Sequence, residues 1–366
     1  MLVSLSKDQE YNSFSHGIKP RIFLFLGFIP LLRKLGGYSV CIVGAGMIAN
    51  SHVRAWRDLA NVVAIVDVIP EKARGFAEGN KIDRWYTSVN EALEKCEFDI
   101  VDVCTPTFTH CEIAVEAMNN GKHVLCEKPI ALTLEDADKM IKASEKNKVK
   151  FMVAHCLRFW NEYRIVKESI DRGEIGEPRI ARAYRYISFP LWGGWQREME
   201  KSGGVLIDMG IHDLDYLRWI IGEVKEVYAN GGILKSKGTD AHDYLHVLLK
   251  FEGEAIAFVE SSWIHPKSHP FTYGLEVVGE RGMLKFSRET SEVVQLWTEG
   301  GGETISPLKR DAISLEIEHF LNCIESGEEP LVTGLEARKS LEVALAAIRS
   351  VEEGRPVRLP LNGGSI

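Results

Sequence analysis

The chain has 366 residues, of which 45% are hydrophobic and 26% charged, and its formal net charge at pH 7 is -8. The length predicts two domains, and the composition is that of a globular enzyme rather than a disordered chain. The acidic balance, without a basic run along the chain, excludes a nucleic-acid-binding protein. The 7 cysteines show neither a CxxC pair nor a Cys/His cluster, so we expect reduced thiols, a cytoplasmic location and no metal.

Residues 1–37 are expected to form an N-terminal extension outside the folded domains. Ile22–Leu32 is an apolar run flanked by basic residues. It is shorter than the about 20 residues that a transmembrane helix needs, and Pro30 interrupts it. No small-residue cleavage site follows the run, so a leader or peripheral arm is favoured over an export signal.

Strands and helices alternate over residues 38–156, which predicts a parallel sheet with right-handed crossovers. The expected strands are short apolar runs, as buried parallel strands are. They are Tyr38–Val43, Val62–Val66, Ile100–Cys104, Val124–Cys126 and Phe151–Ala154. The expected helices are Met47–Leu59, Pro70–Gly79, His110–Asn119 and Leu134–Asn147.

Longer strands dominate residues 157–366, and short glycine-containing turns between several of them predict antiparallel neighbours. The expected strands are Arg179–Ser188, Lys225–Ile233, Tyr244–Phe251, Ala255–Trp263, Phe271–Gly279 and Gly282–Ser287. The expected helices are Glu162–Arg172, Gly204–Ile221, Ala312–Ser326 and Gly334–Glu353. We therefore expect an α+β domain with a large, open antiparallel or mixed sheet. Few helices remain to cover that sheet, so its apolar face predicts a homodimer or homotetramer.

The segment from Gly44 to Ala49 reads G-x-G-x-x-A and lies between a predicted strand and a predicted helix. In this context Gly44 permits a tight turn, Gly46 lets the backbone approach a pyrophosphate, and the helix N-terminus offers N–H groups to the phosphates. Residues 38–156 are therefore assigned to a Rossmann NAD-binding domain. The expected cofactor contacts are Gly44, Ala45, Gly46, Met47 and Ile48.

Asp67 ends the second predicted strand, about twenty positions after the glycine turn. A carboxylate there accepts hydrogen bonds from the ribose hydroxyls and repels the 2′-phosphate of NADP. Val68, Ile69 and Pro70 follow it, rather than Arg or Lys, so NAD is favoured over NADP. The same carboxylate can cap the next helix, and the two roles are compatible.

Four motifs, in order and spacing, resemble the Gfo/Idh/MocA family, named after glucose–fructose oxidoreductase and inositol dehydrogenase. They are the G-x-G-x-x-A turn with His52, Cys104–Thr107 with His110, the E-K-P triplet Glu127–Pro129, and Ser202–Gly204 with Asp208 and His212. The resemblance runs from about Tyr38 to the C-terminus and implies a Rossmann domain followed by an α+β substrate domain. It also implies further NAD contacts from Thr105, Pro106, Thr107, His110, Glu127 and Lys128.

Lys128 follows a predicted buried strand, at the edge of a doubly wound sheet where ligands bind. Its ammonium can donate to a substrate hydroxyl there, although most lysines at strand ends are simply solvated. The family resemblance implies that this lysine is catalytic. Asp208 and His212 are four positions apart in a predicted helix, so they share one face, where the carboxylate can orient the imidazole. A surface pair is the alternative, but the apolar neighbours indicate burial.

Three further residues are expected near the substrate. Arg158 either reaches a substrate oxygen or ties the two domains together, and the sequence favours neither. Trp192 and Trp195 lie in the loop before the predicted Asp208 helix, where aromatic faces can stack on the C–H faces of a sugar. Core packing is the alternative for both tryptophans.

The resulting hypothesis is an NAD-dependent oxidoreductase that transfers a hydride between a sugar, polyol or nucleotide-sugar hydroxyl and the nicotinamide. Lys128 and His212 bind the reacting hydroxyl, His212 accepts its proton, and Asp208 orients His212. One alternative is an NAD-dependent glycoside hydrolase of the same family with no net redox. The other is a non-catalytic NAD-binding regulator, against which the presence of all three residues argues.

Overall fold

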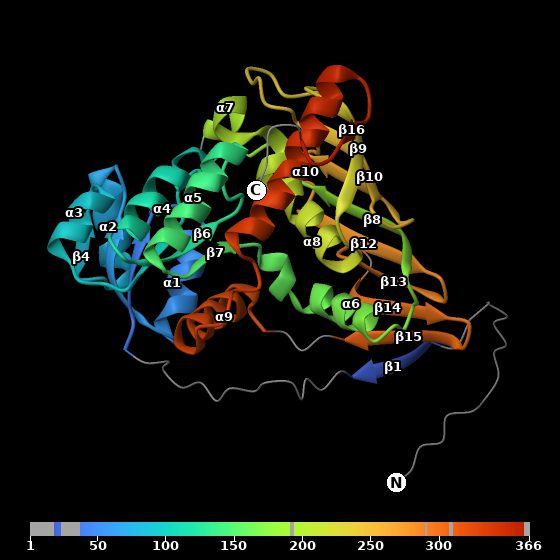
Figure 1. The fold of residues 1–366 in the computed structure, drawn as a ribbon, viewed down its shortest axis with the longest axis horizontal. Helices are drawn as coiled ribbons and strands as arrows, with labels where there is room; N and C mark the ends of the chain where they lie inside the picture. The colour runs from blue at the N-terminus through green and yellow to red at the C-terminus, as the bar shows by residue number, and fades with distance from the viewer. Residues whose placement is uncertain (1–17, 23–36, 191–193, 290, 307–309, 362–366) are drawn as a thin grey trace, which may run out of the picture.

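The computed structural model describes residues 18–22, 37–190, 194–289, 291–306 and 310–361. Two β-sheets organise these residues, as Figure 1 shows. The first is a six-stranded parallel sheet in the order β4-β3-β2-β5-β6-β7. The second is a ten-stranded, mostly antiparallel sheet in the order β1-β15-β14-β13-β12-β8-β11-β10-β9-β16. The fold class expected from the sequence is confirmed: a Rossmann-type sheet is followed by a mixed sheet.

In the parallel sheet, β3 and β4 lie on one side of β2, and β5, β6 and β7 lie on its other side. The strand order therefore changes direction between β2 and β5, which are neighbours at the centre of the sheet. Its strands are β2 (Ser39–Val43), β3 (Asn61–Val66), β4 (Arg84–Tyr86), β5 (Ile100–Val103), β6 (His123–Glu127) and β7 (Phe151–Ala154). The crossover helices are α1 (Ala49–Arg57), α2 (Pro70–Asn80), α3 (Val89–Lys95), α4 (His110–Asn119) and α5 (Leu134–Asn147). Ligands of doubly wound folds bind outside the carboxyl ends of the strands at such a switch point.

Local chemistry fixes the helix ends, as α5 illustrates. The Thr133 hydroxyl accepts a hydrogen bond from the backbone N–H of Asp136 and caps the first turn. At the other end Lys148 adopts the left-handed conformation that terminates many helices. The residues that α5 buries recur at helical spacing, which places them on one face of the helix. They are Ala137, Met140 and Ala143.

The large sheet alternates buried and exposed side chains along most of its strands, so one face packs on helices. Its strands are β1 (Ile18–Ile22), β8 (Pro178–Tyr186), β9 (Val224–Gly232), β10 (Tyr244–Phe251), β11 (Ile256–Ser262), β12 (Thr272–Gly279), β13 (Gly282–Ser287), β14 (Ser291–Thr298), β15 (Gly301–Ser306) and β16 (Val357–Arg358). The β8–β11 and β1–β15 pairs are parallel and the other pairs antiparallel. β1 therefore adds an edge strand to this sheet from the expected N-terminal extension, of which residues 1–17 and 23–36 lie outside the described part.

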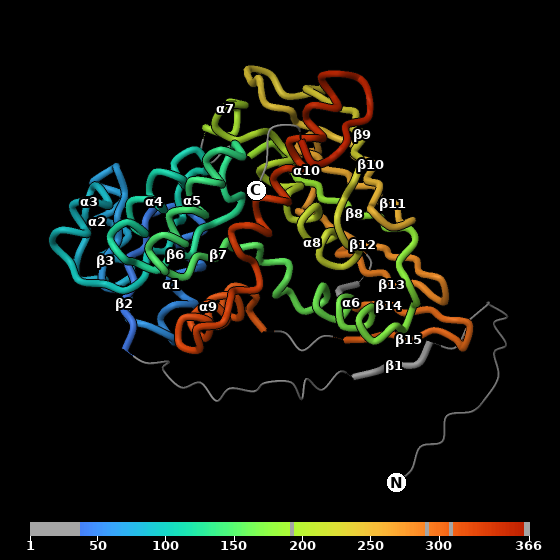
Figure 2. Tube along the Cα trace, in the orientation of Figure 1, coloured from blue at the N-terminus to red at the C-terminus, as the bar shows by residue number. Residues whose placement is uncertain are grey.

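The helices that follow β7 lie between or beside the two sheets. They are α6 (Asn161–Asp171), α7 (Met199–Ser202), α8 (Ile211–Ile221), α9 (Ala312–Ser326) and α10 (Gly334–Glu353). Figure 2 shows α9 beside α1, although they are far apart in the sequence. Just before α10, the Val153 N–H of β7 donates to the carbonyl of Val332. The C-terminal helices thus hold the parallel sheet against the large sheet. None of the described helices has the length and apolar character needed to cross a membrane.

Candidate active site

The glycine turn after β2 has the shape that a dinucleotide pyrophosphate needs. Gly44 has φ +104°, and a Cβ built on it would lie 2.6 Å from the carbonyl oxygen of Cys104, so only glycine fits there. Next to Gly46, by contrast, the space is open, with its nearest neighbour 4.0 Å away. Helix α1 begins just beyond, and no side chain caps it. Its first N–H groups are therefore available to phosphate oxygens.

Asp67 lies at the carboxyl end of β3 and accepts two backbone hydrogen bonds, each 2.9 Å long. The donors are the N–H groups of Ala45 and Ile69. The carboxylate thus holds the glycine turn and the N–H of Ile69 ahead of α2, but it does not cap that helix, which has no side-chain cap among the described residues. Its charge stays beside the turn, where it disfavours a cofactor with a 2′-phosphate.

Two residues expected to contact NAD make hydrogen bonds that hold the loops in place. The ring of His110 is buried, and each of its nitrogens lies 2.9 Å from a carbonyl oxygen, of Pro129 and of Thr105 respectively. His110 therefore ties the loop after β5, which contains Thr105, Pro106 and Thr107, to the loop after β6. Burial lowers the pKa of His110.

The second is Glu127, whose carboxylate is used within the protein. Its Oε1 lies 3.0 Å from Nε2 of His52, and its Oε2 accepts from the N–H of Lys128 at 3.0 Å. On the other side, Nδ1 of His52 contacts the buried carboxylate of Asp102 at 2.9 Å. Burial opposes the charge on His52, but Asp102 and Cys104 raise its pKa well above the usual value. This buried network fixes the backbone that presents Lys128.

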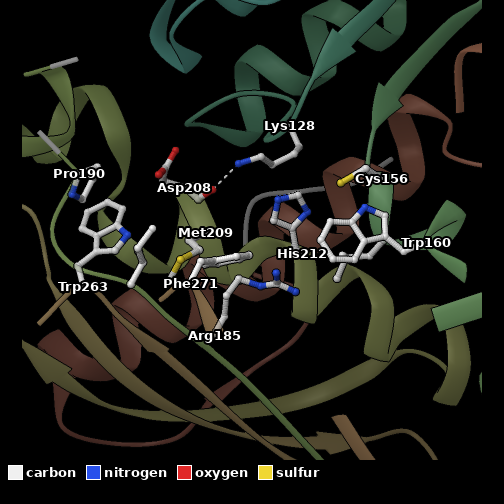
Figure 3. A pocket seen from close by; sticks show the side chains of 12 residues that line it. Lys128, Cys156, Trp160, Arg185, Pro190, Asp208, Met209, His212, Trp263 and Phe271 are labelled. Atoms are coloured by element: carbon white, nitrogen blue, oxygen red, sulfur yellow. Dashed lines mark hydrogen bonds between the residues drawn. The ribbon is translucent and has the colours of Figure 1, made fainter. Parts of the chain in front are cut away.

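A cavity of about 260 Å³ lies where the ends of the parallel strands meet the large sheet (Figure 3). The ammonium Nζ of Lys128 points across it and donates to the backbone carbonyl of Asp208 at 2.5 Å. The cavity thus brings together the three residues expected to be catalytic: Lys128, Asp208 and His212. It is lined by Lys128, Cys156, Leu157, Trp160, Arg185, Ile187, Pro190, Asp208, Met209, His212, Trp263 and Phe271.

The sequence predicts one continuous α-helix through Asp208 and His212, but the structure places Asp208 in a π-helical turn, Leu206–Gly210, ahead of α8. Such turns interrupt the regular hydrogen-bond ladder and are frequent at functional sites. Gly210 lets this turn lie against β11, because a Cβ there would meet the Ser261 Oγ at 2.2 Å. The irregular turn is therefore what places the Asp208 carbonyl within reach of Lys128.

Asp208 does not orient His212 in the described structure, contrary to the expectation from their spacing. Its carboxylate makes no hydrogen bond to the imidazole, and the Nδ1 of His212 is buried without a partner. His212 lines the cavity, so Nε2 is the ring nitrogen left for a substrate. Burial, then the charges of Lys128 and Arg185, lower the pKa of His212 well below its usual value. Burial raises the pKa of Asp208.

Arg158, expected near the substrate, is engaged within the protein and is not among the residues that line the cavity. Its Nε and Nη2 donate to the buried carboxylate of Asp215, both at 2.8 Å, and its Nη1 donates to the carbonyl of Leu331. All three residues belong to the expected second domain, residues 157–366. Trp195 is half-buried and also lies outside the cavity lining, while Trp192 falls outside the described residues.

The sequence reading missed Arg185 and an aromatic set formed by Trp160, Trp263 and Phe271. Arg185 lies on β8 with its guanidinium held by Asp213 and by the hydroxyl of Tyr163. These bonds use Nε and Nη2, so Nη1 is the donor left for the cavity. The sequence could have indicated that Arg185 is buried, because it follows Ala181 and Ala183 at the alternate positions that face the buried side of the strand. The aromatic residues come from three separate segments, and only the fold brings them together.

Comparison with known proteins places this geometry in a family. Residues 38–155 match the model "Oxidoreductase family, NAD-binding Rossmann fold", and residues 163–285 match the "GFO/IDH/MocA C-terminal domain". The myo-inositol 2-dehydrogenase of Thermotoga maritima is 31% identical over 332 residues, covering 87% of this chain and 97% of its own. The scyllo-inositol 2-dehydrogenase (NAD(+)) of Bacillus subtilis is 31% identical over 310 residues, covering 82% and 89%. The structure of a putative myo-inositol dehydrogenase from Sinorhizobium meliloti superposes with a TM-score of 0.76 at 28% identity, covering 88% and 100%. The chain belongs to the Gfo/Idh/MocA family of NAD-binding oxidoreductases.

Proposed function

We propose that this protein oxidises a ring hydroxyl of a cyclic polyol or single-ring sugar, with inositols as the first class to test. One observation supports this most directly. Nζ of Lys128 and the imidazole of His212 lie at the same cavity, at the carboxyl edge of the parallel sheet. Relatives 31% identical over most of the chain are named as inositol dehydrogenases.

The chain's own groups divide the work at the reacting hydroxyl. Lys128 donates a hydrogen bond to its oxygen and stabilises negative charge that develops there. Nε2 of His212 accepts the proton, and its lowered pKa keeps the imidazole neutral and ready to do so. Bound NAD supplies the hydride acceptor. The reverse reaction uses the same two groups.

The cavity suits a small, polyhydroxylated ring. Its volume of about 260 Å³ is below the range of about 300–1,000 Å³ common for drug-sized ligands, which favours one ring over a nucleotide-sugar. The faces of Trp160, Trp263 and Phe271 can stack on C–H groups. Nη1 of Arg185 supplies a donor for a second substrate oxygen, away from Lys128.

A screen of inositols, aldoses and sugar acids with NAD, followed at the absorbance of NADH, tests the proposal. We expect net NADH formation with at least one cyclic polyol or single-ring sugar. Turnover of a glycoside without net NADH would instead support the hydrolase alternative. Tight NADH binding without turnover of any of these substrates would support a regulator.

We further propose that the enzyme works as a homodimer or homotetramer in the cytoplasm. Helices α6, α8 and α10 lie on one face of the large sheet (Figure 1), and the opposite face carries exposed apolar side chains. All 7 cysteines are free, as expected in a reducing compartment. The assembly is tested below.

A further inference from the structure

His212 lacks the partner that a general base of its kind requires. To accept a proton at Nε2, a neutral imidazole must carry its hydrogen on Nδ1, and an acceptor beyond Nδ1 normally fixes that tautomer. Among the described residues, Nδ1 of His212 is buried without such an acceptor, and Asp208 does not supply it. The group that completes the site must therefore lie on the buried side of the ring.

His155 is a buried ring next to His212. It follows β7 directly, it is 1% exposed, and both of its ring nitrogens are buried without hydrogen bonds. Its ring meets that of His212 edge to face, with 6.3 Å between the centroids and 88° between the planes. Buried polar atoms without partners are rare in folded proteins, and three of them belong to these two neighbouring rings.

The carboxylate of Asp215 lies close to His155. Oδ2 of Asp215 lies 3.7 Å from Nδ1 of His155, just beyond hydrogen-bond range. Arg158 holds both carboxylate oxygens of Asp215, and the hydroxyl of Ser340 donates to one of them. Burial opposes ionisation of Asp215, but the charges of His155 and Arg158 hold its pKa at about 2. The carboxylate therefore stays anionic and faces Nδ1 of His155.

We propose that Asp215 and His155 form a buried relay that orients His212 for proton transfer, with His155 as its positioning residue. In the relay, Nδ1–H of His155 donates to Asp215, and Nε2 of His155 accepts from Nδ1–H of His212 through one bridging water or a small ring rotation. Nε2 of His212 is then free to take the substrate proton. This inference rests on the proposed alcohol oxidation.

The charges around His155 explain why Asp215 would act on His212 through His155 rather than directly. Besides Asp215 and Arg158, the charged groups that act on His155 are Lys128 and Glu127. Burial lowers the pKa of His155 to about 4, so it is neutral in the working enzyme. A neutral imidazole can transmit the pull of Asp215 to His212 without placing another full charge beside Lys128. The hydrogen-bonded chain thus favours the protonated form of His212 after transfer.

The decisive variant is His155→Phe, which keeps a ring of similar size and removes both nitrogens. We expect kcat/KM for alcohol oxidation to fall roughly tenfold to a hundredfold, the loss seen when a partner that orients a metal-binding histidine is removed. The plot of kcat/KM against pH should also change. Without the negative charge of Asp215 acting through His155, the pKa of His212 falls. The acidic limb of the kcat/KM profile therefore moves to lower pH, and the plateau of the profile drops. His155→Gln, which retains a donor and an acceptor, should recover part of the loss.

Stability and cofactor binding separate this role from a structural one. Because His155 is buried with unsatisfied nitrogens, His155→Phe should leave the thermal midpoint unchanged or raise it. NADH binding, followed by fluorescence, should stay near normal. His123→Phe, at the far end of β6 from Lys128, is the matched control and should keep the wild-type pH profile.

Two results would overturn the relay. One is a His155→Phe enzyme with wild-type kcat/KM and an unmoved pH profile. The other is a loss of activity that parallels losses in thermal midpoint and NADH binding with the pH limb unchanged, which indicates a structural role. Both require an active wild-type enzyme, so failure of the relay is distinct from failure of the proposed function, in which the wild type oxidises none of the substrates.

Discussion

In the proposed mechanism Lys128 and His212 act on the same hydroxyl from different domains, so their losses should not add. We expect Lys128→Ala and His212→Ala each to lower kcat about a hundredfold to ten-thousandfold. The double variant should be scarcely worse than the worse single variant, because each needs the other to act. Steady-state kinetics on a verified substrate provides the measurement. Lys146→Ala, on the exposed side of α5, is the matched control.

Cofactor binding to these variants should be nearly unchanged, since the glycine turn and Asp67 are untouched. NADH titration by fluorescence checks this point. Near-normal turnover by both Lys128→Ala and His212→Ala would contradict the mechanism.

Asp67 should set the preference for NAD over NADP. In Asp67→Ser with Val68→Arg, a cation replaces the anion near the ribose, so the ratio of the NADH and NADPH dissociation constants should shift toward NADPH. NADH affinity should also fall, because the carboxylate now holds the N–H groups of Ala45 and Ile69. NADPH binding as tight as NADH binding by the unmodified protein would refute this assignment.

At the scale of the element, the π-helical turn depends on Gly210. Gly210→Ala should destabilise the protein by about 1–3 kcal/mol, because the new Cβ would overlap the Ser261 Oγ. The turn also positions Asp208 and His212, so kcat should fall with stability. Ser261→Ala removes the closest contact and should recover part of both losses, a coupling that a double-mutant cycle measures by chemical denaturation.

Gly75→Ala, within α2, is the control for that experiment. A Cβ there meets no atom within 4 Å, so alanine should stabilise the helix by about 0.5–1 kcal/mol. Equal effects of alanine at Gly75 and Gly210 would show that close packing against β11 does not matter.

Periodicity and capping residues were enough to predict whole elements where local and tertiary preferences agree. The bounds of α5, α9 and α10 match the expected ones. β15 was missed because its sequence, GGETIS, has one large apolar residue and obtains its place from pairing with β14. The π-turn was missed for a related reason: it depends on a contact with β11, which is distant in sequence.

The same limit applies to the site. Lys128, His212 and the glycine turn stand in local motifs and could be located from the sequence. The partners of His212 could not, since spacing pointed to Asp208 while the fold places His155 beside the ring. Arg185 could have been found, because a charged side chain on the buried side of an alternating strand is costly unless it is paired, and its presence there indicates a specific role.

At the scale of the molecule, the catalytic groups depend on two sheets keeping their relative position. Lys128 follows β6 of the parallel sheet, and His212 lies in α8 on the large sheet. The hydrogen bond from Lys128 Nζ to the Asp208 carbonyl joins the two sides of the cavity. On the side of the large sheet, Arg158 holds Asp215 of α8 and the carbonyl of Leu331. A fold that closes its cavity from both domains excludes water from hydride transfer.

The open face of the large sheet provides the last prediction. Ile180 on β8 pairs with Ile256 on β11, and these side chains are 42% and 51% exposed; Leu248 on β10 is 51% exposed. Contiguous exposed apolar side chains on a broad sheet mark an interaction surface, and a second copy offers a complementary one. Light scattering at micromolar concentration should give two or four times the 41.1 kDa chain mass. Ile256→Glu with Leu248→Glu should give the single-chain mass, because assembly would bury unpaired charges. Val68→Glu, 82% exposed on the parallel domain, should leave the assembly intact. A single-chain mass for the unmodified protein would show that this face has no second copy against it.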